Sequence, residues 1–191
     1  PDLPAVLEPA VWEGRPQPAP TPSAAQAPGV LPDPTSAPAP APGPEALPVH
    51  ADTADRVLDH LLDTLGRYAG FELDVHARGD LRHHLVEDVA IALGLALRDE
   101  IPAACRRYGE ATVPMDDALV HAALDAGGRP YYEGPLPSRL YDHFLRSLAT
   151  HAAITLHVRV LRGRDLHHIV EAAVKAVGLA LRQALAPAAT V

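Results

Sequence analysis

Histidine and glutamate residues recur in this sequence at a spacing that suits metal binding. The pattern His-His-x-x-Glu occurs twice, and an Asp-His pair precedes each occurrence. The eight candidate donors are His60, His83, His84, Glu87, His143, His167, His168 and Glu171. On a helix, residues i and i+4 share a face and residue i+1 lies about 100° further round the axis, so neighbouring histidines can point to different ions. Six imidazoles and two carboxylates divide into two sites of four ligands with open positions. Such sites suit Mn, Fe, Zn, Co or Ni, and six-coordinate geometry favours Mn or Fe.

Both occurrences belong to an internal repeat. Residues 56–97 align with residues 139–181, first at an offset of 83 and, from the paired histidines onward, at an offset of 84. A single His-His pair near a helix start is more often a surface or capping feature than a ligand pair. Repetition of the same residue types at matching places is not expected by chance, so the repeat favours metal binding. The alternative is an old duplication whose ligands no longer bind.

Each copy predicts the order helix, strand, turn, helix. In the first copy, leucines at helical spacing surround His60, and residues 71–75 alternate between apolar and polar as in a strand. Gly79 then predicts a turn, and an apolar face of period 3.6 over residues 86–97 predicts a second helix. The same order recurs in the second copy.

The segment between the copies predicts more of a sheet. Residues 118–124 and 129–132 suggest a strand pair with a turn at Gly127-Gly128. The predicted fold is an α/β (α+β) sandwich of two duplicated half-domains, about 51–100 and 115–187, each a small sheet packed with two helices.

Residues 1–50 differ in composition from the rest of the chain. Fifteen of the 21 prolines lie there, and the segment cannot bury enough apolar surface to offset its ordering entropy. We therefore expect a Pro/Ala-rich disordered arm or linker over residues 1–50 and one domain over residues 51–191.

Composition also narrows the expected surroundings of the chain. No apolar run reaches the ~20 residues that a membrane-spanning helix needs. The formal charge of −8 argues against nucleic acid as a partner, and the single cysteine, Cys105, cannot form an internal disulfide. These features favour a cytoplasmic protein with neither membrane nor nucleic acid as partner.

Several strings resemble those of the imidazoleglycerol-phosphate dehydratase family. They are FELDVHARGDL, HHLVEDVAIALG, VPMDDALV, GGRP and ITLHVRVLRGRDLHHIVEA, and with VKA and ALRQA they cover residues 57–185 in the order of the family. The resemblance implies two Mn²⁺ ions held by the eight donors named above. It also implies a homo-oligomeric shell of 24 subunits with the metal sites at subunit interfaces.

The resemblance further implies a binding site for the phosphate of a small phosphorylated imidazole substrate. Its residues would be Arg107, Arg129 and Lys175, whose forked or compact cationic groups suit a phosphate. Two simpler interpretations remain open. Arg107 is equally consistent with a solvated loop residue, and Lys175 stands four residues after Glu171, the spacing of a helical ion pair.

By resemblance the reaction is the dehydration of imidazoleglycerol phosphate to imidazole acetol phosphate in histidine biosynthesis. Loss of the C3 hydroxyl follows removal of the C2 proton, with Glu171 expected to move that proton and Glu87 as the second catalytic carboxylate.

The sequence departs from the family in several places. The Pro/Ala arm replaces the N-terminal hairpin of the family, Thr64 stands where glutamine is expected, and the terminal Ser-Thr-Lys-Gly phosphate loop is absent. Two alternatives to the dehydratase are therefore a metal-dependent relative with another substrate and a non-catalytic metal-binding homologue that forms a symmetric assembly.

Overall fold

The computed structural model describes residues 47–188, which form four helices and six strands. The predicted arm therefore falls almost entirely outside the described residues, and the first strand begins at Val49. In chain order the elements are β1 (Val49–Asp52), α1 (Arg56–Ala69), β2 (Leu73–His76), α2 (Arg82–Glu100), β3 (Tyr108–Met115), β4 (Ala118–Asp125), β5 (Tyr131–Glu133), α3 (Arg139–His151), β6 (Thr155–Arg162) and α4 (Leu166–Leu185).

The internal repeat appears in the structure as two βαβα units. In the first, β1 and β2 are parallel neighbours with Val49 opposite Leu73. In the second, β5 and β6 are parallel neighbours with Tyr132 opposite Leu156, which are the same two positions 83 residues later. The predicted order of helix, strand and helix is confirmed in both copies, and each copy gains a short strand before its first helix.

The predicted pairing of the strands between the copies is wrong. Residues 118–125 form β4, which pairs antiparallel with β3 on one side and with β6 on the other. The strand after Gly127-Gly128, β5, lies beyond β6, so the sheet order is β3-β4-β6-β5. The connection that contains the two glycines therefore leads past β6 to the far side of it and does not close a hairpin, because β6 lies beside β4.

Strand β3 was not predicted from the sequence, because it has few large apolar residues. Its inward side chains are small because α4 packs against its backbone. A Cβ on Gly109 would lie 1.9 Å from the carbonyl oxygen of Ala180 on α4, so only glycine fits there. Small inward residues weaken the apolar alternation that marks a strand.

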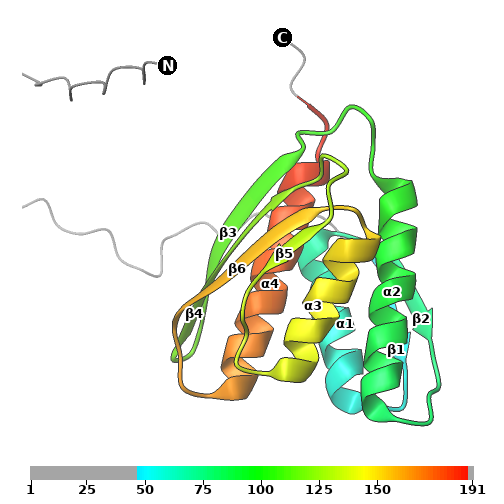
Figure 1. The fold of residues 1–191 in the computed structure, drawn as a ribbon, viewed down its shortest axis with the longest axis vertical. Helices are drawn as coiled ribbons and strands as arrows, with labels where there is room; N and C mark the ends of the chain where they lie inside the picture. The colour runs from blue at the N-terminus through cyan, green and yellow to red at the C-terminus, as the bar shows by residue number, and fades with distance from the viewer. Residues whose placement is uncertain (1–46, 189–191) are drawn as a thin grey trace, which may run out of the picture. The chain divides into compact units, whose positions relative to one another are not determined.

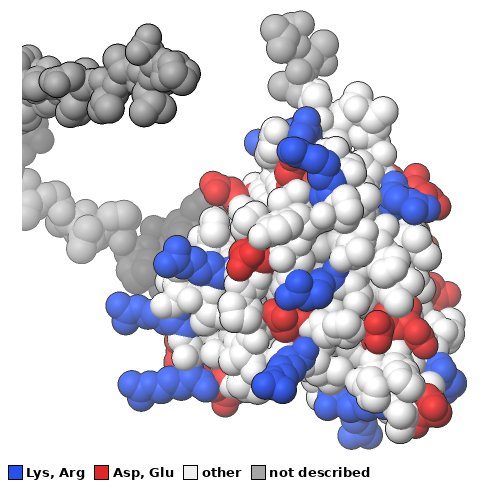
Figure 2. Space-filling view, in the orientation of Figure 1, with Lys and Arg blue, Asp and Glu red and all other residues white. Residues whose placement is uncertain are grey.

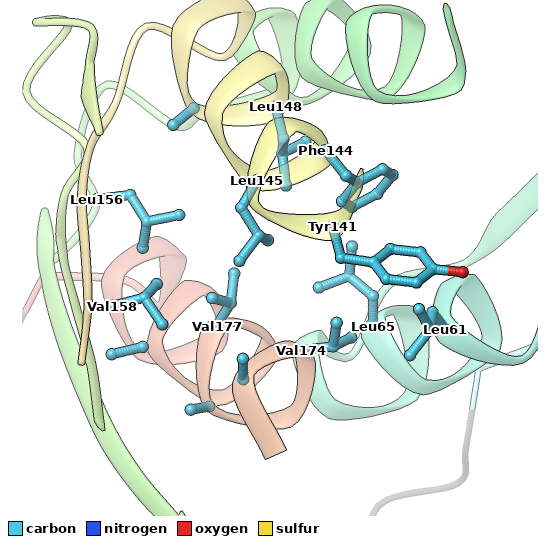
Figure 3. Packing of buried hydrophobic residues seen from close by; sticks show 14 of the residues in the cluster. Leu61, Leu65, Tyr141, Phe144, Leu145, Leu148, Leu156, Val158, Val174 and Val177 are labelled. Carbon is cyan, nitrogen blue, oxygen red and sulfur yellow. The ribbon is translucent and has the colours of Figure 1, made fainter. Parts of the chain in front are cut away.

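Four helices lie between the four-stranded sheet and the β1-β2 pair (Figure 1). They pack as two pairs, α1 with α4 and α2 with α3. Figure 3 shows Leu145 of α3 pointing toward Val177 of α4, with Leu156 and Val158 of β6 on the sheet side of them. The predicted α/β architecture of two similar halves is confirmed.

Equivalent glycines set the close approach within each helix pair. A Cβ on Gly94 of α2 would lie 2.8 Å from the carbonyl oxygen of Leu148 on α3. A Cβ on Gly178 of α4 would lie 3.2 Å from the carbonyl oxygen of Leu65 on α1. Both glycines stand seven residues after the glutamate of their copy. Close packing at these points therefore determines how near each glutamate comes to the partner helix.

The surface carries charges of both signs, and the helices that the structure describes are not of the membrane-spanning kind. On the face drawn in Figure 2, acidic and basic side chains are interspersed with uncharged ones. Within residues 47–188, every helix is too short or too polar to cross a membrane.

Candidate metal centre

The repeated donors of α1 and α4 form a compact cluster. The Nε2 atoms of His60 and His167 each lie 3.2 Å from Oε2 of Glu171. One donor atom from each of the three residues lies within 4.8 Å of the others, a spacing that can hold one metal ion. The cluster joins residues that are 111 positions apart in the sequence.

Local sequence places these side chains on the facing surfaces of two helices. Asp165 caps the N-terminus of α4 by accepting hydrogen bonds from the backbone N–H groups of His167 and His168. From this start His167 and Glu171 are four residues apart, so they lie on one face one turn apart. The helix start therefore determines which histidine of the pair stands beside the glutamate.

The other helix pair, α2 and α3, carries the equivalent donors. Nε2 of His143 lies 3.2 Å from Oε1 of Glu87, the counterpart of the His60–Glu171 contact. His83, one turn before Glu87, packs its ring against His84 with 4.2 Å between centroids. This cluster is more open, since the Glu87 side chain is 38% exposed and that of Glu171 is 9% exposed.

The two remaining histidines point to aspartates instead of to these clusters. Nδ1 of His84 lies 3.2 Å from Asp80. His168 has Asp117 2.8 Å from Nδ1 and Asp116 3.3 Å from Nε2, both in the turn between β3 and β4. Because each is one residue from its paired histidine, it lies about 100° round the helix. The structure thus brings three expected ligands together between α1 and α4 and two between α2 and α3. His84 and His168 point to aspartates.

Electrostatics keep Glu171 ionised. Burial by itself raises the pKa of Glu171, but hydrogen bonds from Lys175 and His60 outweigh it and hold the pKa below its ordinary value. Nζ of Lys175 lies 2.8 Å from Oε1 of Glu171, so the alternative of an i,i+4 ion pair is present. A carboxylate that is charged at neutral pH is ready to bind a cation.

The aspartates of the β3–β4 turn act on His168. The hydrogen bond with Asp117 raises the pKa of His168 above its ordinary value, although desolvation opposes it. The same carboxylate accepts a hydrogen bond from the backbone N–H of Arg164, just before α4. Asp117 therefore fixes both the orientation of the imidazole and the loop that leads into the helix.

The three expected phosphate ligands fall into two separate places. Arg107 donates two hydrogen bonds to Asp125, of 2.6 and 2.9 Å, and Arg129 lies 3.7 Å from the same carboxylate. The backbone N–H of Arg107 bonds to Ala184 O near the end of α4. Thirteen residues of α4 separate Ala184 from Glu171, or about 20 Å along the axis at 1.5 Å per residue. Within one chain, these arginines therefore do not reach the His60–Glu171 cluster.

Sequence reasoning gave no role to the aspartates that precede His60 and His143. Asp59 Oδ1 accepts hydrogen bonds from the backbone N–H and the hydroxyl of Thr53, at 2.8 and 2.6 Å. Asp142 Oδ1 likewise accepts one from the backbone N–H of Leu136, the equivalent position, at 2.9 Å. These bonds tie the segment after each short strand to the helix that carries the histidine. The sequence could have indicated this role, because an aspartate precedes the histidine in both copies of the repeat.

The donors present fit a divalent transition metal. Imidazole nitrogen and carboxylate oxygen are its usual ligands, and Glu171 is buried, ionised and within 4.8 Å of two imidazoles. The fold and these clusters together define a class, an α/β protein built from an internal repeat with a candidate divalent-metal centre at each helix pair.

Comparison with known proteins narrows this class. Residues 53–181 match the family described as imidazoleglycerol-phosphate dehydratase. The proteins of that name from Frankia casuarinae and Mycolicibacterium smegmatis are 46% and 45% identical to this chain, over 71% and 72% of it and 77% of each relative. The crystal structure of the Staphylococcus aureus dehydratase superposes with a TM-score of 0.69 at 33% identity, covering 73% of this chain and 88% of that one. The Pyrococcus furiosus enzyme gives 0.65 at 38% identity, covering 75% and 86%. The chain belongs to the imidazoleglycerol-phosphate dehydratase family.

Proposed function

We propose that this chain is a hydro-lyase that dehydrates imidazoleglycerol phosphate to imidazole acetol phosphate in histidine biosynthesis. The observation that carries the proposal is the His60–His167–Glu171 cluster, repeated between His143 and Glu87, in a member of the dehydratase family. Lys175 pairs with Oε1 of Glu171, which leaves Oε2 between the two imidazoles as the oxygen that can bind a cation.

The metal ligands of this proposal are the eight repeated donors. His60, His167 and Glu171 hold one ion, and His143, His83 and Glu87 hold the other, with Mn²⁺ expected at both. When bound, the ions supply positive charge that stabilises the negative charge developing on the imidazole ring of the substrate. The depressed pKa of Glu171 favours its role as a ligand, and its role in moving the C2 proton requires that its second oxygen faces the substrate.

We further propose that the fourth ligand of each centre comes from a neighbouring subunit. His84 and His168 lie beside their own clusters in sequence but point to Asp80 and to Asp116 and Asp117. An aspartate on Nδ1 orients the ring and presents Nε2 as the nitrogen that can bind metal. At His168 the metal would have to replace Asp116, which lies 3.3 Å from Nε2. Such sharing requires a symmetric homo-oligomer, for which the 24-subunit shell is our expectation.

The proposed phosphate site also combines residues of two subunits. Lys175 lies beside Glu171, whereas Arg107 and Arg129 lie about 20 Å further along α4 by the helical rise. We propose that the arginines bind the phosphate of a substrate held by the metal centre of a neighbouring subunit. Asp125, which now accepts from Arg107, then competes with the phosphate and keeps the guanidinium oriented.

Metal analysis tests the ligand assignment. Purified, Mn²⁺-loaded protein is expected to contain two ions per chain, and His60→Ala and His143→Ala are each expected to lose one of them. His157→Ala is the matched control, because His157 is an exposed histidine outside both clusters. Unchanged metal content in both cluster variants would overturn the assignment.

Turnover tests the reaction itself. The Mn²⁺-loaded protein is expected to convert imidazoleglycerol phosphate to imidazole acetol phosphate, and Glu171→Gln is expected to lower kcat by about 10²–10⁴-fold, as for a residue that moves a proton. Folded, metal-loaded protein that gives no product would refute the dehydratase and favour a relative with another substrate or no catalysis.

A further inference from the structure

A second group of metal-binding side chains lies on the two-stranded sheet. His50 on β1 stands directly opposite Asp74 on β2, and His76 follows Asp74 by two residues. Because side chains alternate between the faces of a strand, Asp74 and His76 project from the same face of β2. One donor atom from each of the three residues lies within 4.8 Å of the other two.

This group is distinct from the centres between the helices. The inner face of the sheet carries Leu73 and Val75, which pack against the hydrophobic core. The group occupies the opposite face, where His76 and Asp74 are 60% and 70% exposed and 3.1 Å apart. The ring centroids of His50 and His76 lie 5.1 Å apart, so the two imidazoles are neighbours on this face.

The charges around the group favour a cation. Asp52 stands opposite His76 in the register and is held by Arg78, 2.8 Å away. With neutral imidazoles, two carboxylates and one guanidinium leave a net negative charge at this face. Two imidazoles with one carboxylate form a ligand set that zinc-like ions prefer over hard ions such as Mg²⁺ or Ca²⁺.

The other copy of the repeat shows that the group is not a by-product of duplication. At an offset of 83 the counterparts of His50, Asp74 and His76 are Glu133, His157 and Arg159. An arginine has no acceptor atom and cannot bind a metal ion. The ligand set is therefore particular to the β1-β2 pair.

The two copies also differ in how their strands are held. Strand β6 has neighbours on both sides, β4 and β5. Within residues 47–188, β2 pairs only with β1, so backbone hydrogen bonds hold it on one side alone. A metal ion bound by one ligand from β1 and two from β2 would cross-link the pair and add binding free energy to the folded state.

We propose that His50, Asp74 and His76 form a structural site for a divalent zinc-like ion that clips β1 to β2. The site is separate from the Mn²⁺ centres and leaves at least one coordination position for water or a further ligand.

Zinc titration of the full chain tests this proposal. The double variant His50→Gln/His76→Gln is compared with wild type and with His121→Gln/His157→Gln, which removes two histidines from the outer face of the four-stranded sheet. After equilibration with Zn²⁺, elemental analysis is expected to find one zinc ion fewer per chain in the first double variant and no change in the control. The metal-free variant is expected to keep the Tm of metal-free wild type, because its changed side chains are exposed.

A second readout does not depend on the helix-pair centres. In a His60→Ala/His143→Ala background, Zn²⁺ is expected to raise Tm and to shift the imidazole NMR signals of His50 and His76, and Asp74→Asn is expected to reduce the rise in Tm. Equal zinc content in wild type and the His50/His76 variant, or unshifted signals of both histidines at saturating Zn²⁺, would overturn the proposal.

Discussion

Gly94→Ala is expected to separate helices α2 and α3 and so weaken the second metal centre. The added methyl group would lie 2.8 Å from Leu148 O, 2.9 Å from His151 Cβ and 3.1 Å from Ala152 N. Two of these three atoms belong to the backbone, so rotation of a side chain cannot relieve the contact. The helices must shift apart, and the His143–Glu87 contact lies two turns further along the same helix pair.

The expected loss of stability combines two opposing effects. Overpacking of a close helix contact costs about 1–3 kcal/mol, and contact with backbone atoms places this case at about 2–3 kcal/mol. Alanine in place of glycine in a helix returns roughly 1 kcal/mol. The free energy of unfolding is therefore expected to fall by about 1–2 kcal/mol, or roughly 2–8 °C in Tm for a domain of this size.

Urea unfolding of the metal-free protein measures this loss, and Mn²⁺ titration measures the effect on binding. Gly66→Ala on α1 is the comparison variant, because its new methyl group would meet side-chain atoms of Val49 on the short strand β1, at 2.8 and 3.1 Å, and not the backbone of a partner helix. Gly94→Ala protein as stable as wild type, with unchanged Mn²⁺ affinity, would refute the argument that this contact sets the helix spacing.

Asp142→Asn weakens the bonds from Tyr132 Oη–H and Leu136 N–H, so a loss of about 1–3 kcal/mol in urea unfolding is expected, and no loss would contradict their role. The hydrogen bond from Arg82 lowers the pKa of Asp55 in the folded protein below its ordinary value of 3.8. The stabilisation from this pair is therefore present above pH 3.8 and is lost as pH falls through the lower pKa of the folded state. The Tm difference between wild type and Asp55→Asn should therefore shrink on acidification, and a difference that grows would reverse this sign. Removal of metal by EDTA should lower Tm, and Mn²⁺ at 100 times its Kd should restore about 2.7 kcal/mol per site, whereas an unchanged Tm would argue against tight binding to the folded state.

The repeat in the sequence determined much of the fold. Helical periodicity and the spacing of His-His-x-x-Glu are local properties. They placed these donors on two helices and indicated that one histidine of each pair stands beside the glutamate while its neighbour points elsewhere. These local properties do not determine the order of the strands in the sheet. The Gly127-Gly128 turn looks like a hairpin in sequence, and only the insertion of β6 beside β4 moved β5 to the far side.

The sequence by itself determined which residue types face which side of each helix, because that depends on the 3.6-residue period alone. Only the tertiary structure decided which faces meet. It joined His60 to Glu171 across 111 residues, placed Arg107 on Asp125 and far from that cluster, and assembled His50, Asp74 and His76 from two strands. The physical reason is that such contacts depend on long-range packing, here set by small residues such as Gly94 and Gly178, whose effect no local pattern records.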